Sequence, residues 1–175
     1  MSRYQLKPKA RFVSILILAI ALFLVTTVVV ILITNQRVPA NPNERATFSR
    51  SVIQDGVTIQ VIFENPIRGI PLNKGVSFNI SVTTHSGDLS DLNPANGAIL
   101  RTSKGLTISE GFQWKWSSRS PHHPAGTLTL LPEGESSGKG VDLATVATAE
   151  WIELEIKSIT GKEPMRFRWS LKSLD

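Results

Sequence analysis

The hydrophobic residues of this chain follow two different patterns, one continuous and one alternating. From Phe12 to Thr34 the sequence runs for 23 residues without a charged residue, a proline or a glycine. With a helical rise of about 1.5 Å per residue, this stretch spans about 34 Å, enough for a hydrocarbon core of about 30 Å. A helix of this length that is apolar on all sides has no place in the core of a small β domain. The pattern therefore predicts a transmembrane helix over residues 12–34.

Beyond residue 46 the pattern becomes an alternation of apolar and polar residues with period two, which is typical of strands with one buried face. The clearest case is Val76–Thr84, and the strongest hairpin joins Ile152–Lys157 to Arg166–Leu171. In that hairpin Phe167, Trp169 and Leu171 share the face that the alternation predicts to be buried. The other predicted strands are Thr47–Ile53, Val57–Phe63, Ala98–Thr102, Leu106–Ile108, Phe112–Trp116 and Gly126–Leu131.

Turn residues separate these strands at intervals of about 8–12 residues, which favours an all-β sandwich of immunoglobulin-like or cupredoxin-like shape. The segment Glu133–Ala149 is rich in Gly and Ser and predicts a long loop, with room for a short helix within Asp142–Ala149. The predicted organisation is a basic cytoplasmic tail (1–11), a transmembrane helix (12–34), a polar, Pro-containing linker (35–46) and an exoplasmic β-sandwich domain (47–175).

The charges that flank the apolar stretch predict its orientation. Four basic residues precede it, no acidic residue occurs before Glu44, and only Arg37 and Arg45 follow shortly after it. The positive-inside rule then keeps the N-terminus in the cytoplasm and places residues 35–175 outside the cell membrane. A signal peptide cleaved after Ala40 in Val38-Pro39-Ala40 is the alternative, but signal h-regions run for about 7–15 residues. We therefore expect a retained, single-pass signal anchor.

Charge and cysteine content narrow the functional classes. The calculated pI of 9.8 comes largely from the tail, since residues 1–34 contain four Lys or Arg and no acid. Residues 35–175 carry the other 15 basic residues and all 14 acidic ones, a net charge of +1, which excludes a nucleic-acid footprint. The chain has no Cys, so disulfides, a lipoprotein anchor, blue-copper sites, iron–sulfur clusters and thiol chemistry are all excluded.

All three histidines fall in two short segments. His85 ends the Val76–Thr84 strand, and His122 and His123 precede the Gly126–Leu131 strand. Strand ends gather at the rims of a sandwich, so the two segments can meet there. Three imidazoles, with Asp88 or Asp91 as a fourth group, are suitable ligands for copper or zinc. Surface loops that merely carry His are the competing interpretation, and adjacent His side chains project to opposite sides unless Pro121 and Pro124 bend the chain.

The segments THSGDLSDL, AILRT, HHPAGTLTL and FRWSL together resemble an uncharacterised family of small exported or membrane-tethered bacterial β domains. That family has a THS-x-DLS segment, a later GHH-x-x-G-x-L segment and an F-x-W-x-L ending. The resemblance covers roughly residues 57–172 and implies no established activity. This chain departs from the family pattern with Pro121 in place of Gly. The positions that the resemblance singles out are His85, Ser86, Asp88, His122, His123 and Gly126.

The sequence contains only weak patterns of catalytic residues. Ser86 directly follows His85, and sequence neighbours on a strand cannot face each other as nucleophile and base. Glu153 and Glu155 lie on the outer face of the C-terminal hairpin, where we expect solvated charges able to pair with Arg166 and Arg168. We therefore expect no enzymatic activity.

Phe112, Trp114 and Trp116 share one face of a strand. A core-facing role for this face is favoured over a platform for a ligand, and Gln113 and Lys115 then face the solvent.

Two functional hypotheses follow. The first is a single-span, membrane-anchored and non-catalytic accessory or structural subunit, whose partners are the lipid bilayer and other membrane-protein subunits. Within its predicted span, Ser14, Ala19 and Ala21 are the small residues that allow close helix contact. The alternative is an exoplasmic copper- or zinc-binding domain with His85, His122, His123 and Asp88 as its ligands.

Overall fold

The structure is a computed structural model that describes residues 42–132, 143–157 and 163–172. The chain divides into two compact units, residues 1–39 and 40–175, and all described residues belong to the second unit. Among the described residues, no helix has the length and apolar character needed to cross a membrane. The predicted tail, the predicted span over 12–34 and most of the predicted linker lie outside the described residues.

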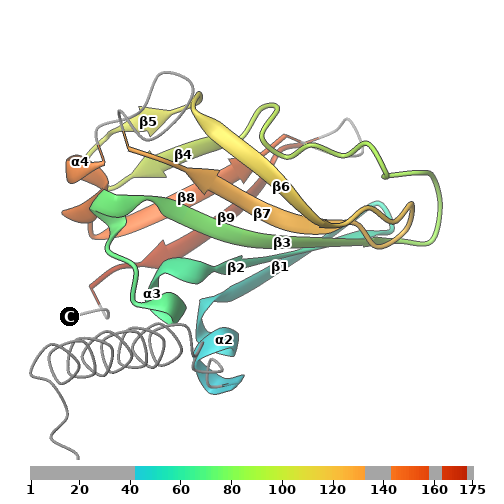
Figure 1. Cartoon of the computed structure of the whole chain (residues 1–175), viewed down its shortest axis with the longest axis horizontal. Coiled ribbons are helices and arrows are strands. Elements are labelled where there is room, and N and C mark those ends of the chain that lie inside the picture. The colour runs from blue at the N-terminus through green and yellow to red at the C-terminus, as the bar shows by residue number, and fades with distance from the viewer. Residues whose placement is uncertain (1–41, 133–142, 158–162, 173–175) are drawn as a thin grey trace, which may run out of the picture. The chain divides into compact units, whose positions relative to one another are not determined.

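Two antiparallel sheets make up the described domain, consistent with the predicted β-sandwich (Figure 1). The strands of the larger sheet follow the order β1-β2-β3-β7-β6, and those of the smaller sheet the order β5-β4-β8-β9. Short helices occupy the connections. The elements are α2 (Pro42–Phe48), β1 (Ser49–Gln54), β2 (Val57–Phe63), α3 (Glu64–Arg68), the 3₁₀ helix η1 (Leu72–Lys74), β3 (Val76–Thr84), β4 (Ile99–Thr102), β5 (Thr107–Ile108), β6 (Phe112–Ser118), β7 (Ala125–Leu130), α4 (Ala144–Ala147), β8 (Trp151–Ile156) and β9 (Met165–Ser170).

The core lies between the sheets and is built from the apolar members of the alternating strands. In β3 every second residue is buried, and in β9 Met165, Phe167 and Trp169 are buried while the intervening residues are exposed. Trp169 is 1% exposed, and its ring lies 5.7 Å from Phe63 and 5.3 Å from Phe78, centroid to centroid. The predicted inward face of the last strand is confirmed.

The outer face of the β8–β9 hairpin differs from the expectation of solvated glutamates. Arg166 Nε donates to Glu155 and Arg168 Nε donates to Glu153, each at 2.9 Å, so the predicted pairs form. The two carboxylate side chains are nonetheless only 10% and 12% exposed. The long arginine side chains lie over the shorter glutamates and cover them, so the prediction of solvated carboxylates was wrong.

The domain begins with a helix where the sequence predicted linker and strand. α2 covers Pro42–Phe48, and β1 begins at Ser49 instead of Thr47. Proline suits the first turn of a helix, where its missing N–H costs nothing, and Glu44 in the same turn complements the helix dipole. The start of the apolar alternation near residue 47 therefore lies at the end of a helix as well as at the start of a strand.

Side chains of β1 close the gap between β1 and β9, the neighbouring edge strands of the two sheets. Arg50 Nε donates to the backbone carbonyl of Arg168 at 3.1 Å, and Gln54 Nε2 donates to that of Glu163 at 3.4 Å. The Arg50 guanidinium also lies 5.9 Å from the centre of the Trp169 ring. The two sheets are thus joined along this side by hydrogen bonds as well as by the core.

The sandwich has two ends with different character. At the histidine end lie the β1–β2 turn, the loop after β3 and the loop after β6, since Val57 pairs with Thr84 and Ser81 with Ala125. At the helical end lie α2, α3, η1 and α4 (Figure 1). α4 falls within the short helix predicted for Asp142–Ala149.

Candidate functional site

The loop after β3 holds His85 on the surface. Thr84 is buried, and its hydroxyl donates to the Ser86 carbonyl at 2.7 Å and accepts from the Ser86 N–H at 3.2 Å. Such a local threonine turn reverses the chain at the end of the strand. Because the turn fixes the residues on both sides, His85 projects into solvent, where it is exposed.

Backbone hydrogen bonds join the end of β3 and this loop to the loop after β6. Thr84 N–H donates to the His122 carbonyl at 3.0 Å, Leu89 N–H to Pro121 at 2.9 Å, and Val82 N–H to Pro124 at 2.9 Å. The two loops that carry the histidines therefore lie side by side, as the strand-end argument predicts. His122 and His123 are both exposed, and His123 N–H donates to the Ser120 hydroxyl at 3.2 Å.

Asp88 is a carboxylate of this surface whose charge is favoured in part by a histidine. Hydrogen bonds from the Ser90 side chain and backbone lower the pKa of Asp88 below its ordinary value, and attraction to His122 adds a smaller effect in the same direction. Within the described residues, no three His, Asp or Glu side chains are arranged to hold a metal ion. The metal set His85, His122, His123 and Asp88 stays a prediction.

Arg119 is a functional candidate that the sequence interpretation missed. Its Nε donates to the Ser90 carbonyl at 3.0 Å, and a terminal nitrogen lies 2.9 Å from Asp91. The guanidinium also lies 5.6 Å from the centre of the Trp116 ring. Asp91, considered above as a fourth metal ligand, is thus engaged by an arginine. The sequence signal that could have revealed this pair is the opposite charge of Arg119 and Asp91, which lie on the two segments that carry the histidines.

On the aromatic face of β6, Trp114 packs against the core and Trp116 lies at the rim. Phe112 and Trp114 pack against the core, which the alternation predicts, while Gln113 and Lys115 are exposed. Trp116 is half-buried and meets Trp114 edge to face, with ring centres 5.4 Å apart. The Trp114 indole N–H is buried without a hydrogen-bond partner in the described residues. Trp116 therefore stands at the boundary between the core and the Arg119 surface.

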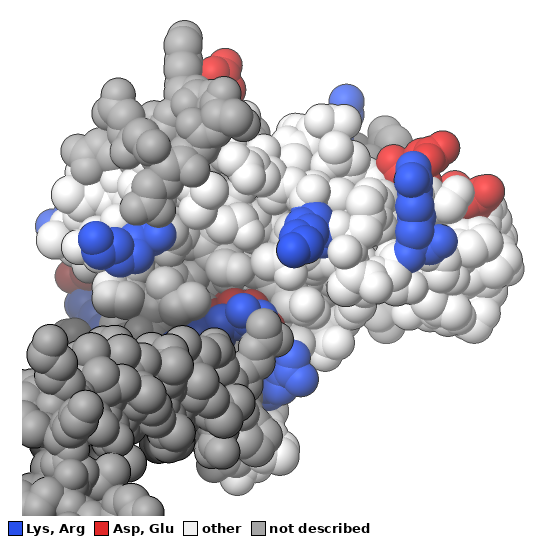
Figure 2. Space-filling model, in the orientation of Figure 1, with Lys and Arg blue, Asp and Glu red and all other residues white. Residues whose placement is uncertain are grey.

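The histidine end is a surface of mixed charge rather than a basic patch. Figure 2 shows acidic and basic side chains close together at the right-hand end of the molecule, where the loops after β3 and β6 lie in Figure 1. Elsewhere on this face Lys and Arg are scattered, with some Asp and Glu side chains and many uncharged residues between them. This distribution suits a polar docking surface and offers no continuous track for a polyanion.

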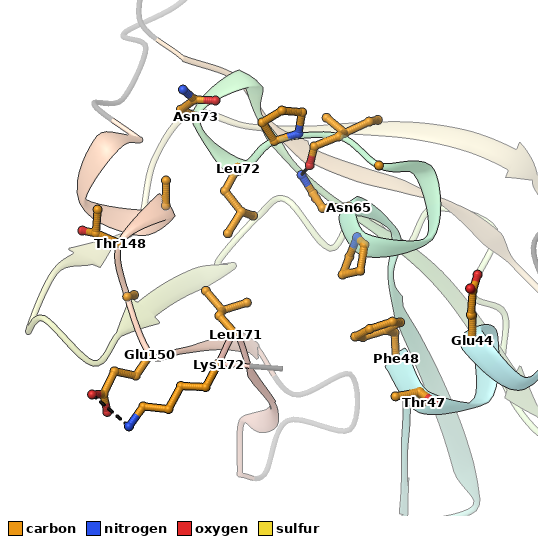
Figure 3. Close-up of a pocket in the computed structure, with 16 residues that line it drawn as sticks. Glu44, Thr47, Phe48, Asn65, Leu72, Asn73, Thr148, Glu150, Leu171 and Lys172 are labelled. Carbon is orange, nitrogen blue, oxygen red and sulfur yellow. Dashed lines mark hydrogen bonds and ion pairs between the residues drawn. The ribbon is translucent and has the colours of Figure 1, made fainter. Parts of the chain in front are cut away.

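An open cavity of about 990 Å³ lies at the helical end, between α2, the α3–η1 segment and α4 (Figure 3). Phe48, Ile70 and Leu72 give it apolar walls, and Glu150 pairs with Lys172 at its rim at 3.0 Å. The Asn65 side chain binds three backbone groups, so it serves the fold. No single sequence segment signals this cavity, because its walls come from four separate parts of the chain.

A buried carboxylate also lies at the helical end. Glu64 is 3% exposed and accepts a hydrogen bond from Arg68 Nε on the same helix. Arg45 of α2 lies 3.9 Å from its other carboxylate oxygen, which has no hydrogen-bond partner among the described residues. Two arginines thus compensate one buried carboxylate, and α2 is tied to α3 through it.

Comparison of the chain with protein-family models, with curated proteins and with solved structures finds no match.

Proposed function

We propose that this chain is a single-span, membrane-anchored and non-catalytic accessory subunit that docks through its N-terminal helix and an exoplasmic β-sandwich. The anchor is supported by the apolar stretch over residues 12–34 and by the four basic residues before it. The sandwich belongs to the immunoglobulin-like or cupredoxin-like class in this proposal. The chain passes from one antiparallel sheet to the other after β3, after β5 and after β7, and these connections support that class.

One observation carries the docking role: three backbone hydrogen bonds fix the loop after β6 to the end of β3 and to the loop that follows β3. These loops present the exposed residues His85, His122 and Arg119. A surface that is already ordered loses little conformational entropy when a partner binds, which favours affinity. Its mixture of charge, imidazole and the half-buried Trp116 is the composition of a polar rim around a small aromatic centre.

The position of this surface supports an outward-facing role. The chain enters the domain at α2, at the helical end, whereas the docking surface lies at the opposite end of β2 and β3. A subunit tethered at one end leaves the other end accessible to soluble or membrane-bound partners.

The topology is tested by adding a protease to intact spheroplasts. The proposal expects loss of the domain and survival of a small N-terminal fragment in the membrane. Full protection of the domain would refute the orientation. A mature N-terminus at Asn41 would instead show that the anchor is removed.

The docking role is tested by a photoreactive amino acid placed at His122 in the full-length protein in cells. Lys104 is the matched control, because it is exposed in the turn between β4 and β5, away from the histidine end. A cross-linked species that forms from position 122, is absent from position 104 and weakens in an Arg119→Ala background supports the proposal. Equal cross-linking at both positions contradicts it.

A copper- or zinc-binding role for the same end is the second candidate. It is favoured by the electrostatic attraction between Asp88 and His122, which makes a small contribution to the lowered pKa of Asp88. Imidazole and carboxylate are ligands for both metals. Binding would require the exposed side chains to rotate toward one another, and the measurement that decides it is metal content of protein purified without a His tag.

A further inference from the structure

Ile70 and Ile53 are the large hydrophobic side chains that the described part of the chain exposes, at 38% and 76% respectively. They lie at opposite ends of the sandwich. Ile53 is next to the β1–β2 turn, whereas Ile70 follows α3, which begins where β2 ends (Figure 1). Because the seven residues of β2 extend about 20 Å, one flat surface at an end of the domain cannot reach both.

The α3–η1 loop holds Ile70 in a fixed position. Ile70 N–H donates to the Asn65 carbonyl at 3.0 Å, and the buried Asn65 side chain donates to the Ile70 carbonyl at 3.1 Å. The same amide donates to the Gly75 carbonyl at 2.7 Å and accepts from Ser77 N–H at 2.8 Å. The exposure of Ile70 is therefore built into the loop, and a surface that covered it would not have to order the backbone.

Basic residues flank this apolar tip. The segment reads Arg68-Gly69-Ile70-Pro71-Leu72-Asn73-Lys74, in which Ile70, Pro71 and Lys74 are exposed. The Arg68 side chain is 50% exposed even though it pairs with Glu64. An apolar tip between basic side chains suits the interface of a bilayer, where the phosphate groups of the lipids pair with the charges and the boundary of the acyl chains takes up the apolar group.

The loop lies at the end where the chain enters the domain. α2 contacts α3 through Arg45 and Glu64, and the Phe48 ring lies 6.5 Å from Phe63, centroid to centroid. Residues 35–41 separate the predicted span from α2, and seven extended residues reach about 25 Å at most.

We propose that the α3–η1 loop, with Ile70 at its tip, rests on the headgroup region of the bilayer that holds the chain's own N-terminal span. The inference rests on the proposed membrane anchor. A contact through one apolar side chain is weak between free partners, but a short tether raises the effective concentration into the millimolar range. The loop contact then fixes the orientation of the domain and turns the histidine end away from the lipid.

The absence of cysteine from the chain provides a direct test. Full-length Ile70→Cys and Ile53→Cys variants each carry a single thiol, which is labelled with a fluorophore sensitive to polarity. Each protein is reconstituted into vesicles of phosphatidylcholine and phosphatidylglycerol that include lipids with a nitroxide on the acyl chain. No other protein is present, so any quenching comes from lipid.

The expected result is a blue-shifted and quenched label in the Ile70→Cys variant and neither effect in the Ile53→Cys variant. Circular dichroism and flotation of the vesicles in alkaline carbonate accompany each measurement. Retention of folded protein with equal signals from the two variants would overturn the loop contact and leave the anchor intact. Loss of folded protein from the vesicles in carbonate would refute the anchor, and the loop contact with it.

Discussion

Gly126 of β7 lies directly against the indole of Trp114 of β6. A Cβ atom at position 126 would lie 2.5 Å from Cζ2 of Trp114 and 2.5 Å from the Lys115 carbonyl oxygen. These separations are far below van der Waals contact, so only glycine allows the tryptophan to occupy this place beside the core. The relationship gives a physical reason for glycine at a position that the resemblance to a family of β domains had singled out.

Replacement of this glycine is therefore expected to be costly. Gly126→Ala should lower the free energy of unfolding by about 1–3 kcal/mol, because the added methyl group overpacks the site. Denaturant unfolding followed by tryptophan fluorescence measures the loss and also reports a displaced Trp114. Trp114→Phe removes the indole atoms that clash, so it should make the Gly126→Ala loss smaller in the double variant. A Gly126→Ala variant as stable as the parent would show that β6 and β7 yield easily here.

Trp169 should be among the most sensitive positions of the core. Trp169→Ala removes a buried ring that contacts Phe63 and Phe78, with an expected loss of about 3–5 kcal/mol. Trp169→Phe keeps an aromatic ring but deletes the 2.8 Å hydrogen bond from the indole N–H to the Phe48 carbonyl. Its expected loss is smaller, about 1–3 kcal/mol. Urea unfolding of the two variants beside the parent tests the order, and a loss below about 1 kcal/mol for Trp169→Ala would contradict it.

The Asp88 carboxyl group should titrate below its ordinary pKa of 3.8, chiefly because Ser90 hydrogen-bonds to its ionised form. A pKa that is lower in the folded state means that Asp88 adds stability above the pKa of the unfolded chain. That contribution disappears as the pH falls through the folded pKa.

Carboxyl-carbon NMR titration measures this shift. Ser90→Ala should raise the Asp88 pKa toward 3.8, and His122→Ala should raise it by less, because attraction to His122 is the smaller cause. An Asp88 pKa at or above 3.8 in the parent protein would contradict the hydrogen-bond geometry of the loop.

Metal binding at the histidine end gives a prediction that depends on pH. Cu(II) should raise the melting temperature near pH 7.5 and much less near pH 5, because protons compete for imidazole below its free pKa of about 6.5. The triple variant His85→Ala, His122→Ala, His123→Ala should lose this rise and keep the metal-free melting temperature, since all three side chains are exposed. A parent protein that is indifferent to Cu(II) and Zn(II) would leave the accessory role without its metal alternative.

Alternating residues made most of this fold predictable. The strands Val57–Phe63 and Val76–Thr84 begin and end as predicted. A strand with one solvated and one buried face alternates polar and apolar residues, so its bounds are clear in the sequence. The helix over Pro42–Phe48 was missed, since a helix of seven residues with no buried member has no periodic signal.

The candidate site was predictable in position but not in its pairings. The loops of His85 and His122 meet, because β3 and β7 are neighbours in one sheet. The pairing of Arg119 with Asp91 and the covering of Glu155 by Arg166 depend on side-chain conformations that the alternation does not determine. The cavity at the helical end depends on four chain segments, so it could be found only in three dimensions.

The hydrogen bond from Arg50 to the Arg168 carbonyl has a consequence for behaviour at high concentration. An unprotected edge strand offers its backbone to strands of other molecules and is a frequent starting point of aggregation. In β9 one such acceptor is occupied by a side chain from the opposite sheet, and the carbonyl of Glu163, just before β9, receives Gln54. Arg50 thus shields part of the edge strand β9 from pairing with a strand of another molecule. Under the proposed membrane anchor, copies of the chain would meet often in two dimensions, and such protection would help to keep neighbouring domains separate.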